Sequence, residues 1–149
     1  MKRFNPNLKY LSKCYNEGVD AKVGACLEGS SRSGTAFSIS PFLISLAAKS
    51  ANTGQKFTCN IIRETYNSHK TTLYNDFNKI LPQFGIENPF QNSKEVASFW
   101  IFGNKINLIG ADKVSKFEGL SGDITWFNEL LDIDNEIFDA AEQRTQRFW

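Results

Sequence analysis

A polar segment framed by two glycines has the composition of a phosphate-binding loop. It comprises Gly29, Ser30, Ser31, Arg32, Ser33 and Gly34. The apolar residues 23–27 before it predict a short buried strand, and apolar positions over Thr35–Lys49 predict a helix after it, with Pro41 inside. In this order of elements, backbone N–H groups and the helix dipole both point at an anion. The segment is therefore a candidate phosphate loop, although a plain strand-to-helix turn explains the same spacing.

Two positions after the loop depart from the usual phosphate-binding pattern. That pattern is a glycine, four residues, a second glycine, a lysine and then a serine or threonine. Gly29 and Gly34 have the required spacing. Thr35 occupies the position of the lysine that reaches the β- and γ-phosphates, and Ala36 that of the hydroxyl that holds Mg²⁺. The predicted nucleotide-binding set is Gly29, Ser30, Ser31, Arg32, Ser33, Gly34, Thr35 and Ala36.

A second candidate follows the apolar run Ile124–Phe127, which predicts a buried strand that ends in Asn128 and Glu129. An acid at such a strand tip can polarise a water for attack on a phosphate. Glu129 is thus the candidate catalytic base, and Asn128 can hold a metal-bound water through its carbonyl oxygen. Alternatively, Glu129 is only a charged residue at a strand end. If the strand tip is misassigned, Asp112 and Asp123 are the nearest other acids.

Three arginines are further candidates. Arg63 follows a predicted strand and either faces a phosphate crevice or pairs with Glu64 or another surface acid. Arg144 and Arg147 are expected on the last helix. Arg144 is a possible arginine finger for a neighbouring subunit, but cations at a solvated helix end also suit the helix dipole.

The elements that must position these residues alternate between strands and helices. Strands are predicted at Phe57–Arg63, Val96–Phe102 and Lys105–Ile109, the last two joined as a hairpin at Gly103-Asn104. This alternation predicts an α/β fold with a mostly parallel central sheet flanked by helices.

Two helices are expected in the second half of the chain. Apolar residues recur at helical spacing at Leu73, Phe77, Ile80, Leu81 and Phe84. Ser68 is the expected cap of this helix, and Pro82 or Gly85 its expected end. The last helix is expected to begin near Asp134, to bury Ile137, Phe138 and Ala141, and to continue to Trp149. On this reading the domain is incomplete at its carboxyl terminus.

Composition bounds the possibilities. The 149 residues suit one domain, and 41% hydrophobic with 22% charged residues is ordinary for a globular protein. The formal net charge is +1, so bulk charge implies no nucleic-acid or membrane partner. We expect no signal peptide or membrane span. Cys14, Cys26 and Cys59 are too far apart for a metal motif, and the last two are expected to pack as small hydrophobes.

Several stretches together resemble the ATPase domain of viral terminase large subunits. Residues 28–34 resemble that family's phosphate loop, in which an arginine is typical, and 61–65 its second strand, which ends in an arginine. Residues 5–7 are similar to the family's entry segment before the first strand. Residues 108–112, 116 and 119–120 resemble the stretch before its acidic strand, and residues 124–129, 137–138 and 142–145 resemble that strand and the helix after it. The resemblance covers nearly the whole chain, in order.

This resemblance implies a P-loop NTPase fold and an ATP- and Mg²⁺-dependent motor that drives double-stranded DNA into a procapsid. Its implied partners are the portal protein, the small terminase subunit and further copies of itself in a ring. It would act in the host cytoplasm, transiently at the portal, with no membrane partner. Residues 1–149 then form a truncated terminase-like ATPase domain without the family's nuclease domain.

Departures from the family pattern leave alternatives open. The resemblance implies that Arg32 partly replaces the missing lysine, because a guanidinium binds phosphate through its planar fork, whereas no residue clearly replaces the hydroxyl at Ala36. Weak nucleotide binding and poor hydrolysis are therefore expected. One alternative is a degenerate or truncated terminase fragment that binds nucleotide, DNA or portal without turnover. Another is an unrelated P-loop protein, such as a small kinase or helicase fragment.

Overall fold

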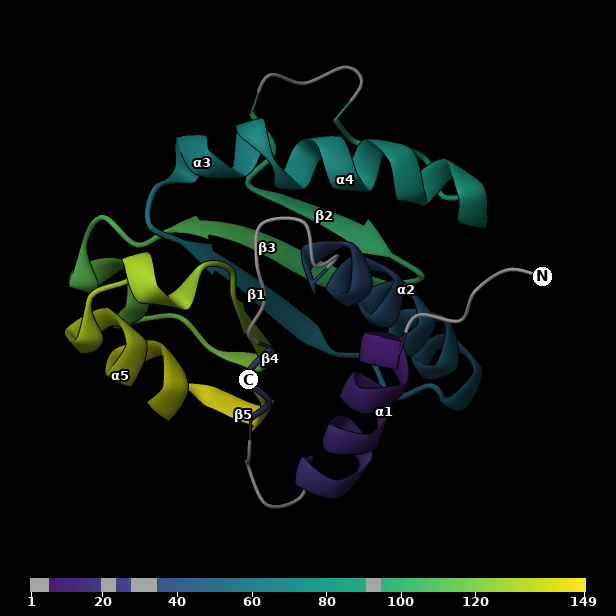
Figure 1. Cartoon of the computed structure of the whole chain (residues 1–149), viewed down its shortest axis with the longest axis horizontal. Coiled ribbons are helices and arrows are strands. Elements are labelled where there is room, and N and C mark those ends of the chain that lie inside the picture. Colours follow the sequence, from purple (N-terminus) through teal and green to yellow (C-terminus); the bar gives the residue numbers. More distant parts are fainter. Residues whose placement is uncertain (1–5, 20–23, 28–34, 91–94) are drawn as a thin grey trace.

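The computed structural model describes residues 6–19, 24–27, 35–90 and 95–149, and among residues 35–37 only the backbone. The strands are β1 (Thr58–Arg63), β2 (Ser98–Ile101), β3 (Asn104–Gly110), β4 (Gly122–Phe127) and β5 (Thr145–Phe148). They form one sheet in the order β2–β3–β1–β4–β5, in which only β2 runs antiparallel (Figure 1). The predicted α/β architecture with a mostly parallel sheet is confirmed.

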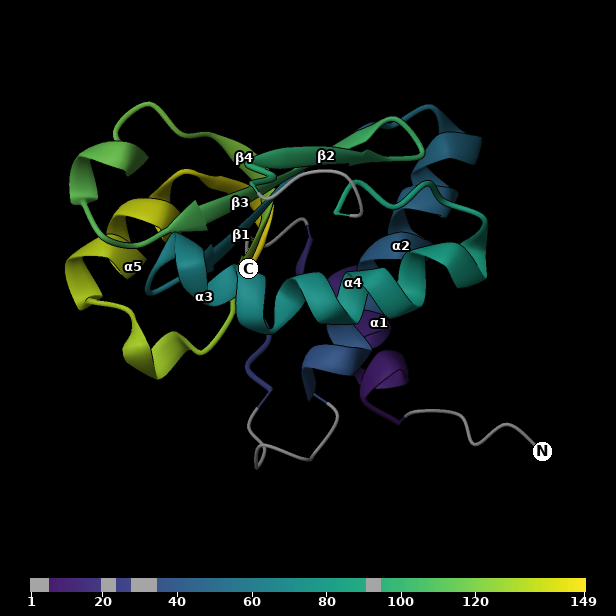
Figure 2. The same ribbon diagram turned by 90° about the horizontal axis from the view of Figure 1, so that it is seen from above.

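Helices cover both faces of this sheet. On one face lie α1 (Pro6–Gly18), α2 (Thr35–Thr53), α3 (Tyr66–Thr71) and α4 (Leu73–Ile80), and on the other lies α5 (Asn135–Gln143) (Figures 1 and 2). Short 3₁₀ turns occur at Leu81–Phe84 (η1), Val114–Phe117 (η2) and Leu130–Asp132 (η3). The result is a three-layer sandwich.

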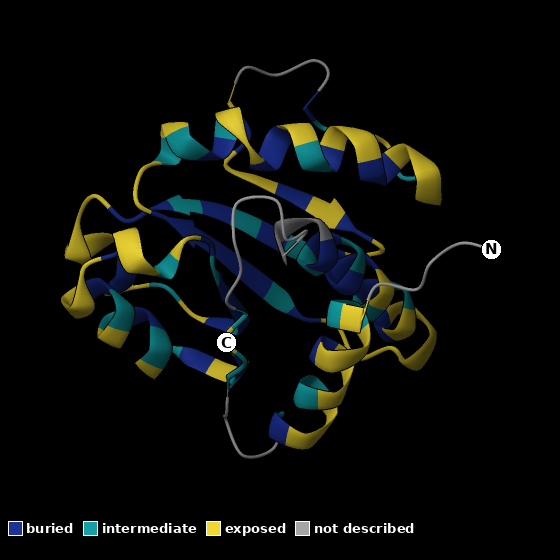
Figure 3. Cartoon of the chain, in the orientation of Figure 1, coloured by how far each residue is buried: buried dark blue, intermediate teal, exposed yellow. Residues whose placement is uncertain are grey.

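The alternation of side chains along each strand gives the two faces separate cores. Cys59 and Ile61 of β1 join a large apolar cluster with α1, α2 and α4, whereas Ile62 joins a smaller cluster with η2 and α5. Buried residues line the contact between the helices and the sheet (Figure 3). Helix α2 contributes Phe42, Leu43 and Ala47 to the large cluster, as expected for a helix with an apolar face.

The helical region after β1 differs from the expectation in one respect. Ser68 does not cap a helix that starts at Leu73; instead it lies inside α3, whose N-cap is Thr65, and its N–H donates to Thr65 Oγ1 at 3.2 Å. A break at Thr72 then separates α3 from α4. The predicted end is confirmed, because Gly85 adopts a positive φ of 67° directly after η1, a conformation that favours glycine.

The hairpin between β2 and β3 is confirmed, and a buried amide holds its turn. The Oδ1 atom of Asn104 accepts hydrogen bonds from Phe57 N–H at 2.9 Å and from the Ser50 hydroxyl at 3.0 Å. Its Nδ2 group donates to the carbonyl oxygens of Ala47 and Ile101. Asn104 is fully buried, so these bonds tie α2, β1 and the hairpin together at the amino edge of the sheet.

The expectation of a helix that continues to Trp149 is wrong. Helix α5 begins after Asp134 as predicted, but it ends at Gln143, and the chain returns as β5 parallel to β4. Within α5, Ile137 and Ala141 are buried, whereas Phe138 is only half-buried and packs edge-on against Trp149. The run from Thr145 is too short to show a strand period in the sequence. It forms a strand because it pairs with β4.

The strand predicted at residues 23–27 is not seen in its described part, residues 24–27. That part nevertheless lies beside the carboxyl end of β5, because Ala25 N–H donates to the carbonyl oxygen of Trp149 at 2.9 Å. A Cβ atom at Gly24 would overlap the indole of Trp149, so glycine permits this close approach.

Two further expectations can be compared with the described residues. Cys59 is buried as expected, but Cys26 is exposed, so the prediction that it packs as a small hydrophobe is wrong. Within the described ranges, no helix has the length and apolar character needed to cross a bilayer.

Candidate functional site

The strand connections create a crevice at the carboxyl edge of the sheet. The chain leaves β1 for α3 and α4 on one face and leaves β4 for α5 on the other. Because β1 and β4 are parallel neighbours, their carboxyl ends form the switch point at which open α/β sheets bind ligands. Arg63 ends β1, and Asn128 and Glu129 follow β4 at this point.

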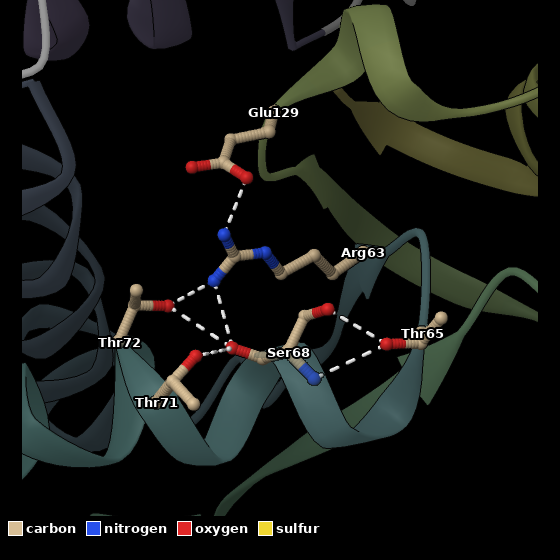
Figure 4. A network of polar contacts seen from close by, with 6 residues as sticks. All are labelled: Arg63, Thr65, Ser68, Thr71, Thr72 and Glu129. Carbon is tan, nitrogen blue, oxygen red and sulfur yellow. Dashed lines mark hydrogen bonds and ion pairs between the residues drawn. The ribbon is translucent and has the colours of Figure 1, made fainter.

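An ion pair spans this crevice. The Arg63 guanidinium contacts the Glu129 carboxylate through one nitrogen, and through the other it donates to Thr72 Oγ1 and, at 2.8 Å, to the Ser68 carbonyl oxygen (Figure 4). The Arg63 side chain is 9% exposed and that of Glu129 is 52% exposed. A buried guanidinium requires acceptors, and the α3–α4 junction supplies two of them.

The Glu129 backbone is unusual. It adopts a left-handed conformation with φ 62° and ψ 61°, which is unfavourable for a residue that carries a Cβ atom. Just before it, Asn128 is buried and its N–H donates to the Ile62 carbonyl oxygen at 2.9 Å, which extends the β1–β4 pairing by one residue. The turn at Glu129 therefore directs its side chain back across the strand ends toward Arg63.

A buried histidine lies beneath this network. His69 of α3 is fully buried, and its Nε2 atom lies 2.9 Å from the Ile109 carbonyl oxygen, whereas Nδ1 has no hydrogen-bond partner among the described residues. Burial lowers the pKa of His69, the bond to Ile109 opposes this shift, and the nearby charge of Arg63 adds to it. His69 is therefore a neutral packing residue under the charged crevice.

The predicted phosphate loop is described only at its margins. Gly29, Ser30, Ser31, Arg32, Ser33 and Gly34 lie outside the described residues, and so do the side chains of Thr35 and Ala36. On one margin, residues 24–27 lie at the carboxyl end of β5. On the other, Thr35 begins α2, which packs on the same face of the sheet as Ile61 and, by alternation, Arg63.

The remaining candidates lie elsewhere. Arg144 was expected on a helix, but it is the residue that caps the carboxyl end of α5, at the amino edge of the sheet. Its guanidinium donates to the Glu118 carbonyl oxygen at 3.0 Å and 3.2 Å. Arg147 lies on β5, again not on a helix, and pairs with Asp123 at 3.1 Å. Asp123 thus lies at the opposite edge from Glu129. Asp112 is exposed and pairs with Lys116 at 2.5 Å.

Sequence reasoning missed the partners that hold Arg63. Of its two alternatives, pairing with an acid is what the structure contains, but the acid is Glu129 rather than Glu64. The Ser68 and Thr72 acceptors had no visible signal, because they depend on the break between α3 and α4. In the described part of the chain, no three His, Cys, Asp or Glu side chains come together as a metal site.

Comparison with protein families identifies the chain. The family model for phage terminase large subunits matches residues 26–147, which is most of its length. The chain belongs to the phage terminase large subunit family. A comparison with curated proteins and with solved structures gave no match. The family match favours the terminase reading over an unrelated kinase or helicase fragment.

Within this terminase, the matched region begins at Cys26, just before the glycine-framed segment, and ends at Arg147 in β5. It therefore includes both halves of the predicted nucleotide site, namely residues 29–36 and the strand tip at Asn128 and Glu129.

Proposed function

We propose that the chain is the ATP-hydrolysing part of a packaging motor that drives double-stranded viral DNA into a procapsid. The observation that carries the proposal is the switch-point crevice, where Glu129 meets Arg63 at the ends of two parallel strands in a terminase family member. Phosphate chemistry suits such a crevice because strand ends, helix amino termini and polar side chains converge there.

In this proposal the residues have separate roles. Gly29, Ser30, Ser31, Arg32, Ser33, Gly34, Thr35 and Ala36 hold the phosphates of ATP. Glu129 accepts a proton from the attacking water, and Asn128 and Glu129 orient the water shell of Mg²⁺. ATP and Mg²⁺ supply the phosphoryl group and the charge that stabilises its transfer.

Arg63 acts as a positioning residue in the same proposal. Its guanidinium holds one oxygen of the Glu129 carboxylate while α3 and α4 hold the guanidinium. Because Glu129 is half-exposed, its other oxygen remains accessible to water. The pair therefore fixes the direction of the base without burying it.

The proposed partners follow from the family. They are double-stranded DNA, the portal protein of the procapsid, the small terminase subunit and further copies of the chain in a ring. The site of action is the procapsid portal in the host cytoplasm. Arg144 remains a proposed arginine finger toward a neighbouring subunit, because its place at the amino edge keeps it away from Glu129 of its own chain.

A second proposal is a terminase module that binds nucleotide, DNA or portal without turnover. It rests on Thr35 and Ala36, which lack the charge and the hydroxyl normally used for phosphate and Mg²⁺. Nucleotide binding measured by calorimetry, with phosphate release measured in parallel, separates the two: binding without release supports the second.

The decisive experiment restores the loop and then removes the base. Thr35→Lys with Ala36→Thr is expected to raise nucleotide affinity. In that background, Glu129→Gln is expected to lower steady-state phosphate release by about a hundred- to ten-thousandfold with binding nearly unchanged. Glu136→Gln, an exposed acid on α5, is the matched control. If Glu129→Gln is as active as the control while Asn128→Asp is inactive, the strand tip is misassigned.

A further inference from the structure

The β2–β3 hairpin carries an uncovered aromatic and basic surface away from the crevice. Trp100 of β2 is 63% exposed, although it belongs to a residue type that is usually well buried. Its direct partner across the hairpin is Lys105 of β3, so the indole and the ammonium stem share one face of the sheet. Among the described elements on this face of the sheet, α5 and η2 lie toward its other end (Figure 2).

A shallow hollow of about 190 Å³ lies beside this pair. Its lining includes Trp100, Lys56, Lys105 and Asp123. Lys56 is fixed in place, because its ammonium donates to the Phe102 carbonyl oxygen at 2.8 Å. Gly103, with φ 77°, leaves room for it, since a Cβ atom there would lie 3.0 Å from Lys56 Nζ. One wall is therefore aromatic, and a positioned cation lies at the rim.

The charge of the hollow favours an anion. Asp123 is the carboxylate among its lining residues, and it is already bonded to Arg147 at 3.1 Å and to Thr58 N–H at 2.8 Å. Lys56 and Lys105 form no ion pair with a described residue, so no described carboxylate neutralises their charges. The amide of Asn107 lies two residues farther along β3 on the same face, opposite Ser98.

We propose that this surface, formed by Trp100, Lys105, Lys56 and Asn107, binds single-stranded DNA by stacking a base on Trp100 and contacting phosphates with the two lysines. Stacking on an exposed aromatic ring and backbone contacts by cations are how proteins hold single strands without sequence readout. A duplex offers no unstacked base to the indole, whereas a single strand offers a base and a phosphate at every nucleotide. The surface is separate from the nucleotide crevice, so the inference holds whether or not the chain hydrolyses ATP.

The test is fluorescence anisotropy with a fluorescein-labelled twelve-residue oligothymidylate, in low salt and without nucleotide or Mg²⁺. Trp100→Ala is expected to weaken binding on the order of ten- to a hundredfold, and Trp100→Phe to retain most of it. Lys105→Gln is expected to reduce the slope of log affinity against log salt by about 0.7. Phe84→Ala and Lys113→Gln, which change an exposed ring and an exposed cation elsewhere, are expected to match the parent chain.

Four outcomes would overturn the proposal. They are no binding by the parent chain, equal affinity for Trp100→Ala and Phe84→Ala, stronger binding to the matching duplex, and competition by polyglutamate with the same dependence on Trp100. The last result would assign the surface to an acidic protein partner. Far-UV circular dichroism of each variant separates lost binding from lost folding.

Discussion

The two edges of the sheet are organised by different kinds of polar network. At the amino edge, the uncharged amide of Asn104 is fully buried and bonds to α2, to β2 and to Phe57 just before β1. At the carboxyl edge, Arg63 is buried but its partner Glu129 is half-exposed and has a left-handed backbone. The amino edge therefore holds a buried and fully bonded network. The carboxyl edge keeps a charged group accessible, and its backbone is locally strained.

The largest expected loss of stability tests the buried network around Asn104. Asn104→Ala leaves Phe57 N–H and the Ala47 carbonyl oxygen without their buried partner, and it should lower the free energy of unfolding by about 3 kcal/mol. Urea denaturation measures this loss. Asn107→Ala, at a half-buried amide that donates to Asn60, is the control, with an expected loss of about 1 kcal/mol. Equal losses would mean that the turn does not depend on Asn104.

The next effect tests the charged edge. Arg63→Met keeps the aliphatic stem but leaves the Ser68 carbonyl oxygen and Glu129 without their donor, and it should cost about 2 kcal/mol of unfolding free energy. The value is below that for a fully buried pair because water can solvate Glu129. Arg147→Met breaks the more exposed pair with Asp123 and should cost less than about 1 kcal/mol. A larger loss for Arg147→Met would reverse the comparison.

Lowering the pH should reduce the free energy of unfolding through protonation of His69. The lowered pKa means that below about pH 6.5 the unfolded chain binds a proton that the folded chain does not, so stability is lost as the pH falls from 7.5 to 5.5. His69→Gln, which keeps an amide donor for the Ile109 carbonyl oxygen, should flatten this dependence. Urea midpoints at the two pH values measure it. An unchanged slope in the variant would assign the dependence to other groups.

The smallest effect isolates the strain at Glu129. Glu129→Ala and Glu129→Gly both remove the ion pair, but only glycine adopts the left-handed conformation freely. The glycine variant should therefore be more stable than the alanine variant by about 1 kcal/mol or slightly less in thermal or urea unfolding. If alanine proves the more stable, the backbone at this strand tip is not strained.

Much of the fold was predictable from the periodicity of apolar residues and from the residues that mark turns. The runs of β1, β3 and β4 and the Gly103-Asn104 turn showed their structure locally, because apolar strands and turn residues carry their own signal. Strand β5 did not, since Thr145–Phe148 is four residues long and forms only by pairing with β4. The Ser68 cap failed for a similar reason, because Thr65 offered an equally good cap three residues earlier.

The sequence predicted which residues are candidates for the site, but it did not predict which of them contact one another. The strand ends marked Glu129 and Arg63 as candidates, because carboxyl ends of parallel strands converge. Their pairing depends on β1 and β4 being neighbours, although β2 and β3 come between them in sequence. Strand order is set by the packing of helices on the two faces, and no local pattern in this chain encodes it.

The contact between Gly24 and Trp149 has a consequence for the order of folding. It joins residues that are far apart in the sequence, and its closure requires that β5 has already paired with β4. The segment leading into residues 29–34 is thereby anchored late in folding, and by the same logic it detaches early when the chain begins to open. Hydrogen exchange at Ala25 should report that detachment well before the β1–β3 pairing is lost.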